Sequence, residues 1–75
     1  MKEYNDKVQC VYLDYVFYAI ETLGWQGVFL KYTDYKFNKL IAWLNDNCTD
    51  RVVFQAAGFA FENKEDAAFF KLKWA

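Results

Sequence analysis

The residues best suited to chemistry are a group of carboxylates and two cysteines. Glu62, Glu65 and Asp66 stand close together in the chain, and a paired general acid and base could be sought among them. Asn63 lies within the group and suits the N-cap of a helix, whose positive end Glu65 and Asp66 would stabilise. We therefore interpret these carboxylates as capping residues rather than as catalytic ones.

The two cysteines, Cys10 and Cys48, would need a base in order to act as nucleophiles, and the chain contains no histidine. Cysteines of a cytosolic protein are more often reduced and buried as small hydrophobic side chains. No ligand spacing suggests a zinc site, and three isolated glycines form no phosphate-binding loop of the common types. The sequence predicts no catalytic activity, no metal and no cofactor.

The composition favours one small folded domain, residues 1–75, with an excess of apolar surface. Hydrophobic residues make up 56% of the chain and aromatic residues 23%, more than so short a chain can bury. A protein-binding face or a homodimer is therefore expected. The net charge of −1 disfavours a general nucleic-acid binder. Apolar runs are too short for a membrane span, and a polar start favours a cytoplasmic location.

The first regular segment, residues 7–18, is rich in β-branched and aromatic residues and is predicted to be a strand. Both of its alternating faces are largely apolar, which predicts a place in the centre of the sheet. Asp14 is the one charge inside it, and it indicates a bulge, a strand end or a helix cap at that point.

Residues 19–32 suit a strand, a helix or a loop. Gly24 and Gly27 flank Trp25 and Gln26, which indicates a turn that presents a tryptophan. Residues 28–32 could then form a short extra strand, paired with the first strand as an antiparallel hairpin.

The clearest helix begins at Thr33 or Asp34, since either residue can cap it. It ends at residues 45–47, where three short polar side chains compete for backbone hydrogen bonds. Its apolar positions follow the i, i+3, i+4, i+7 spacing of a buried helix face. These positions are Phe37, Leu40, Ile41 and Leu44.

Two further strands follow the helix. Residues 51–55 form one strand, and Ala56 and Ala57 lead into a tight turn in which Gly58 is expected to supply a positive φ. Phe59 and Phe61 alternate with smaller and charged residues, a pattern typical of a strand with one face on the core and the other in water.

Two patterns compete in the last residues. Asn63 favours a short helix from Lys64, with Ala67 and Phe70 on its buried face. Beyond it, Phe70, Leu72 and Trp74 alternate with lysines, and we favour a terminal strand over a longer helix. In both cases Phe70 and Trp74 are predicted to anchor the core.

The predicted elements belong to the α+β class. They describe a small antiparallel sheet with two helices on one face, in ferredoxin-like βαββαβ order, with room for the extra short strand.

The chain from Phe59 to Trp74 reads Phe-x-Phe-Glu-Asn-x-x-Asp-Ala-x-x-Phe-x-Leu-Lys-Trp. This stretch, about a fifth of the sequence, resembles the C-terminal signature of small, mostly uncharacterised proteins of tailed bacteriophages. The matching residues are Phe59, Phe61, Glu62, Asn63, Asp66, Ala67, Phe70, Leu72, Lys73 and Trp74. The resemblance implies no shared chemistry. Residues 19–33 are longer than the loop expected in such proteins, and any added function is expected there.

The resemblance implies a non-enzymatic phage accessory protein of the host cytoplasm. Such proteins often bind a host protein, including one of a defence system, and inhibit or modulate it. Aromatic residues are enriched at the hot spots of interfaces. We predict that four aromatic residues form the contact surface, the alternative being that they complete the core. They are Trp25, Tyr32, Tyr35 and Trp43.

The alternative function is a single-stranded nucleic-acid-binding module, because ferredoxin-like sheets can stack unpaired bases on exposed aromatic residues. The slightly acidic net charge, and the need of the core for the same aromatic residues, disfavour this function. The candidates would be Tyr12, Phe54, Phe59 and Phe61 for the bases, with Arg51 and Lys31 for phosphate.

Overall fold

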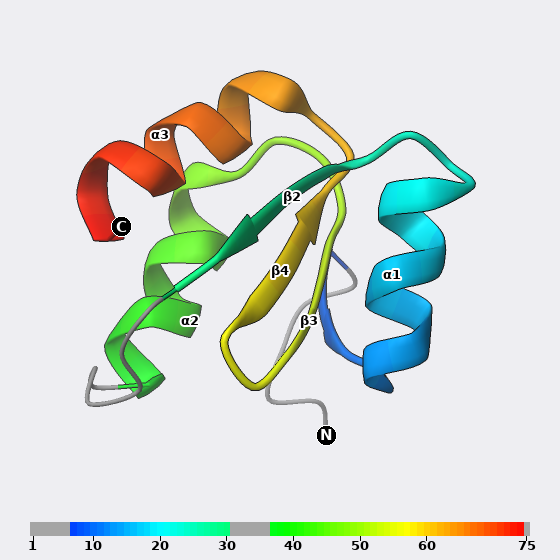
Figure 1. The fold of residues 1–75 in the computed structure, drawn as a ribbon. Helices are drawn as coiled ribbons and strands as arrows, with labels where there is room; N and C mark the ends of the chain where they lie inside the picture. The colour runs from blue at the N-terminus through cyan, green and yellow to red at the C-terminus, as the bar shows by residue number, and fades with distance from the viewer. Residues whose placement is uncertain (1–6, 31–36, 75) are drawn as a thin grey trace.

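The computed structural model describes residues 7–30 and 37–74, and these residues form a sheet with helices on both of its faces (Figure 1). The predicted α+β class is confirmed. In chain order the elements are β1 (Val8–Cys10), α1 (Leu13–Glu21), β2 (Gln26–Phe29), α2 (Phe37–Asn47), β3 (Val52–Gln55), β4 (Gly58–Phe61) and α3 (Lys64–Trp74).

The sheet is mixed rather than antiparallel. Its strand order is β1-β3-β4-β2, with β1 parallel to β3 and the other two pairs antiparallel. The element order βαβαββα therefore replaces the expected ferredoxin-like order. β1 lies at an edge, not at the centre, and β2 pairs with β4 at the opposite edge instead of forming a hairpin with β1.

The predicted strand over residues 7–18 is wrong beyond Cys10, because residues 13–21 are helical. Within them, Val16 and Ala19 are one turn apart and fully buried, which is the spacing of a helix face. Asp14 stands in the first turn, where a negative charge stabilises the helix dipole. The aromatic residues that suggested a strand lie on the exposed side of this helix.

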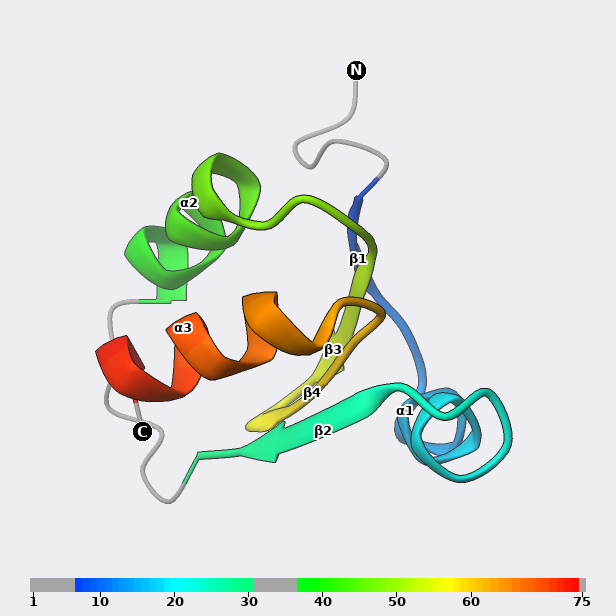
Figure 2. The ribbon, with the colours of Figure 1, turned by 90° about the horizontal axis from the view of Figure 1, so that it is seen from above.

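The three helices are divided between the two faces of the sheet. Two of them, α2 and α3, cover one face as predicted, and α1 covers the other, where no helix was expected (Figure 2). This third layer explains why every residue of β4 is buried, although alternating exposure was predicted.

The core on the side of α2 and α3 is the larger one and contains stacked and tilted aromatic rings. Phe59 and Phe70 have ring centroids 4.8 Å apart, and Phe61 and Phe70 have theirs 5.1 Å apart. The helix positions Leu40, Ile41 and Leu44 are buried in this core as predicted. Its members are Val8, Val28, Leu30, Leu40, Ile41, Leu44, Cys48, Val52, Phe54, Phe59, Phe61, Ala67 and Phe70.

The turn between β3 and β4 uses Ala56, not Gly58, for its positive φ of 53°. Gly58 instead begins β4 under the ring of Phe29, its cross-strand partner. A Cβ atom at Gly58 would lie 2.8 Å from Cε2 of Phe29, so a larger residue here would need the half-exposed ring of Phe29 to shift.

The chain end is a helix as far as Trp74, so the favoured terminal strand is wrong. The predicted cap is confirmed, because Oδ1 of Asn63 accepts hydrogen bonds from the backbone N–H of Glu65 at 2.7 Å and of Asp66 at 3.3 Å. Phe70 is fully buried and Trp74 packs against the core, as predicted on either interpretation.

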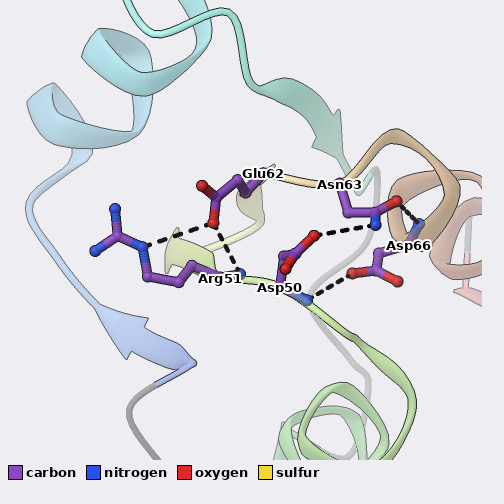
Figure 3. A network of polar contacts seen from close by, with 5 residues as sticks. All are labelled: Asp50, Arg51, Glu62, Asn63 and Asp66. Atoms are coloured by element: carbon purple, nitrogen blue, oxygen red, sulfur yellow. Dashed lines mark hydrogen bonds and ion pairs between the residues drawn. The ribbon is translucent and has the colours of Figure 1, made fainter.

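The carboxylates at this helix start have structural partners (Figure 3). The buried Asp66 accepts hydrogen bonds from the backbone N–H of Thr49 at 2.9 Å and of Asp50 at 3.2 Å, which fixes the loop before β3. Glu62 accepts a hydrogen bond from the backbone N–H of Arg51 at 3.3 Å and pairs with its Nε at 3.7 Å. These hydrogen bonds give Glu62 and Asp66 a structural role in the loop before β3.

We expect Asp66→Ala to lower the free energy of unfolding by about 1–3 kcal/mol, because two backbone donors would lose their acceptor. Urea denaturation measures the change. The matched control is Glu65→Ala, an exposed residue in the same turn, with an expected change within about 0.5 kcal/mol. Equal stability of the two variants would contradict this role of Asp66.

Candidate functional site

The outer side of α1 exposes an unusual number of large apolar side chains. Each of them is at least 41% exposed, and Tyr12 reaches 84%. We call these residues the aromatic face of α1: Tyr12, Leu13, Tyr15, Phe17, Tyr18 and Phe29.

The inner side of α1 explains this exposure. Val16 and Ala19 pack with Val53 and Ala60 of the sheet, so small side chains form the contact between helix and sheet. Gly27 allows a similarly close approach, since a Cβ atom there would lie 2.6 Å from Cδ1 of Ile20. The larger side chains of α1 are left on its outer side.

Ring contacts hold the aromatic face together. Phe17 stacks on Phe29 of β2, with ring centroids 5.8 Å apart and planes at 23°. Tyr15 and Tyr18 form a tilted pair with centroids 5.7 Å apart. Rings that are already restrained lose little conformational entropy when a partner covers them.

Two carboxylates, Asp14 and Glu21, lie on the same exposed side of α1. They are seven residues apart, which corresponds to two turns or about 10 Å along the helix. No lysine or arginine occurs in residues 8–30. Since neither carboxylate forms an ion pair within the described part of the chain, the aromatic face carries uncompensated negative charge.

An apolar depression lies on the opposite side of the sheet, between α2 and α3. It has a volume of about 450 Å³. Trp43 forms part of it, and its ring also packs against Phe70, with centroids 6.0 Å apart. The lining residues are Trp43, Asn47, Phe69, Leu72 and Lys73.

Of the four predicted contact residues, Trp25 and Trp43 are described by the structure, and they lie apart. Trp25 is buried in the α1-side core, 9% exposed, with the guanidinium of Arg51 5.4 Å from its ring centroid. Trp43 is half-buried and lies against the other core. Trp25 and Trp43 therefore belong to opposite faces of the sheet. Tyr32 and Tyr35 lie outside the described residues.

The sequence interpretation missed the aromatic face because residues 7–18 were assigned to a strand. In a central strand, Tyr15, Phe17 and Tyr18 would have been core residues. The spacing of Val16 and Ala19, together with Asp14 as a helix-start residue, was the signal that could have revealed the helix.

The aromatic residues proposed to stack on nucleic-acid bases are mostly inaccessible. Phe54, Phe59 and Phe61 are at most 1% exposed beneath α2 and α3. Tyr12 is exposed, and Arg51 pairs with Glu62. Lys31 lies outside the described residues.

Both cysteines are free thiols in different environments. Cys48 is buried as predicted, whereas Cys10 is exposed, contrary to the prediction. Burial, and to a smaller extent the nearby Asp66, raise the pKa of the Cys48 thiol to about 12, although Lys7 acts in the opposite direction. Lys7 also donates a hydrogen bond of 2.6 Å to the carbonyl oxygen of Cys48. A neutral, buried thiol is a poor nucleophile.

Across residues 7–30 and 37–74, no group of three or more His, Cys, Asp or Glu side chains is arranged to hold a metal ion. Within the same residues, the helices are too short or too polar to span a membrane.

Comparisons with known proteins add no relative: no family model matches the chain, and neither the curated proteins nor the solved structures include a significant match. The site is therefore interpreted from the residues of this chain alone.

We expect Ellman's reagent at pH 8 to modify Cys10 rapidly in the folded protein and Cys48 only after denaturation. At this pH the Cys48 thiol stays protonated, because its pKa of about 12 lies far above it. The release of thionitrobenzoate measures the reaction, and a Cys10→Ser variant isolates Cys48. Rapid modification of Cys48 in the folded variant would contradict the buried environment.

Proposed function

We propose that this chain is a non-catalytic binding protein that contacts another protein through the aromatic face of α1. One observation carries the proposal: α1 packs on the sheet through Val16 and Ala19 and turns its largest side chains, including Phe17 and Tyr18, toward solvent. Large apolar side chains exposed together on one helix, with polar residues among them, are typical of an interaction site.

The aromatic face has the composition of an interface centre. Tyrosine and phenylalanine are enriched in such centres, and a ring that is about half exposed contributes roughly 0.7–1.5 kcal/mol from the hydrophobic effect when it becomes fully buried. The face also extends over two elements, because Phe29 of β2 stacks on Phe17 of α1. The depression between α2 and α3 offers fewer exposed rings, with Phe69 as its large exposed aromatic residue.

The identity of the partner class rests on the C-terminal resemblance from Phe59 to Trp74. It supports a phage accessory protein that acts in the host cytoplasm by inhibiting or modulating a host protein, including a protein of a defence system. The absence of histidine supports a function that depends on binding rather than on catalysis.

A different protein is a better partner for the aromatic face than a second copy of the chain. A two-fold symmetric dimer pairs a surface with itself. Pairing through this face would bring Asp14 and Glu21 of both copies close together, and like charges in contact are destabilising. We therefore propose a host protein as the partner in preference to the homodimer that the sequence also suggested.

We expect the double variant Phe17→Ser/Tyr18→Ser to lose capture of the host protein that the tagged wild-type chain recovers from nuclease-treated host lysate. Two exposed rings are removed while the contacts of Val16 and Ala19 remain, so the fold should persist, as circular dichroism would check. Mass spectrometry of the recovered proteins measures capture.

The matched control for this experiment is Phe69→Ser/Leu72→Ser, which removes two exposed apolar side chains from the other side of the sheet. This control should retain capture. If the control loses capture and the α1 variant retains it, the proposed surface is wrong. If recovery disappears on nuclease treatment, the nucleic-acid alternative is favoured instead.

A further inference from the structure

We propose that the partner presents a cationic and apolar segment to the aromatic face of α1, with lysine or arginine side chains against Asp14 and Glu21. This inference rests on the proposed function and specifies the chemistry of the partner. Apolar side chains of the same segment would cover the rings beside the two carboxylates.

Helix geometry places the carboxylates at the centre of the exposed side. At about 100° per residue, Asp14 and Glu21 lie within about 20° of one another around the helix and opposite Val16 and Ala19. By the same geometry Phe17 lies on one side of them and Tyr18 on the other. A partner that covers the rings must therefore also cover the carboxylates.

A partner that covers these carboxylates removes their hydration, and this cost favours a cationic partner. An ionised carboxylate loses hydration on contact, and this cost is large unless an opposite charge or a hydrogen-bond donor replaces the water. The nearby guanidinium of Arg51 lies over Trp25 and pairs with Glu62 instead. An uncharged or anionic partner would leave Asp14 and Glu21 uncompensated, whereas a cationic one compensates them.

The aromatic rings beside the carboxylates also favour a cationic partner. A guanidinium or ammonium group is attracted to the face of an aromatic ring. Tyr15 and Tyr18 form an exposed pair on the side of the helix that carries the acids. A cation that approaches Glu21 or Asp14 can therefore contact a tyrosine ring as well.

Glu21 is the more informative of the two acids. Asp14 stabilises the helix dipole from the first turn, so local stability is enough to explain it. Glu21 is the last residue of α1, where the dipole favours a positive charge, and the last turn contains no basic residue. A residue that opposes local stability on an interaction surface is best explained by a role in binding.

The test uses two designed helical peptides as probes. Both contain leucine on one side, and the other side carries lysine in the first peptide and glutamate in the second. Titration into the ¹⁵N-labelled protein, followed by NMR, should show that the lysine peptide shifts the amide signals of residues 13–21 and of Phe29. The glutamate peptide should leave them unchanged.

Charge variants distinguish recognition of lysine by Asp14 and Glu21 from nonspecific hydrophobic binding to the rings. Asp14→Asn/Glu21→Gln should weaken binding of the lysine peptide by about tenfold, from the loss of two exposed ion pairs. The control Asp46→Asn/Glu65→Gln removes two exposed carboxylates from α2 and α3 and should bind as the wild type does. Glu21→Lys, which replaces one exposed ion pair by a like-charge contact, should also weaken binding by about tenfold without lowering Tm, which distinguishes lost contact from lost folding.

Equal binding of the two peptides, or full binding by Asp14→Asn/Glu21→Gln, would overturn the cationic partner. The captured host protein gives a separate readout for the proposed function. If it is lost by Phe17→Ser/Tyr18→Ser but kept by Asp14→Asn/Glu21→Gln, the surface is correct and the cationic partner is wrong. If both variants keep it, the surface itself is wrong.

Discussion

The close contact between α1 and the sheet is the interaction on which the surface of this protein depends. Val16 and Ala19 meet Val53 and Ala60, and all four are at most 4% exposed. Small side chains on both sides bring the helix near the sheet, and the ring of Trp25 completes this core. Because Val16 and Ala19 face the sheet, Tyr15, Phe17 and Tyr18 of α1 lie on the exposed side of the helix. The packing of Val16 and Ala19 on the sheet thus adds α1 as a third layer and also exposes the aromatic face.

The two faces of the sheet differ in how many large side chains they bury. On one face, Phe54, Phe59 and Phe61 interlock with Phe70 of α3, and this core holds most of the large buried side chains. The buried Asp66 fixes the loop before β3 to the start of the same helix. Because this side supplies a large core, the α1 side can expose aromatic residues, which a chain of this length could not otherwise leave in water.

Local signals in the sequence were sufficient where they agreed with tertiary packing. The cap at Asn63 and the buried spacing of Leu40, Ile41 and Leu44 were predicted correctly. The assignment of residues 7–18 failed because β-branched and aromatic composition outweighed the spacing of Val16 and Ala19. Strand order depends on contacts between distant residues, such as the parallel pairing of β1 with β3, and no local pattern encodes it.

The candidate site, too, depends on contacts between distant residues that local sequence patterns do not encode. An excess of aromatic residues correctly indicated surface beyond the needs of the core, because it follows from composition alone. Which residues are exposed depends on the face that each element turns to the sheet. Trp25, expected on the surface, is covered in the α1-side core, whereas Phe17 and Tyr18, which fell in the predicted central strand, are exposed on a helix.

Site-specific photo-crosslinking tests most directly whether the aromatic face of α1 is the contact surface. Benzoylphenylalanine would replace Tyr18 in one protein and Phe69 in another, both exposed but on opposite sides of the sheet. Irradiation in host lysate should give one discrete adduct from position 18 and none from position 69. An adduct from position 69 alone would contradict the proposed surface.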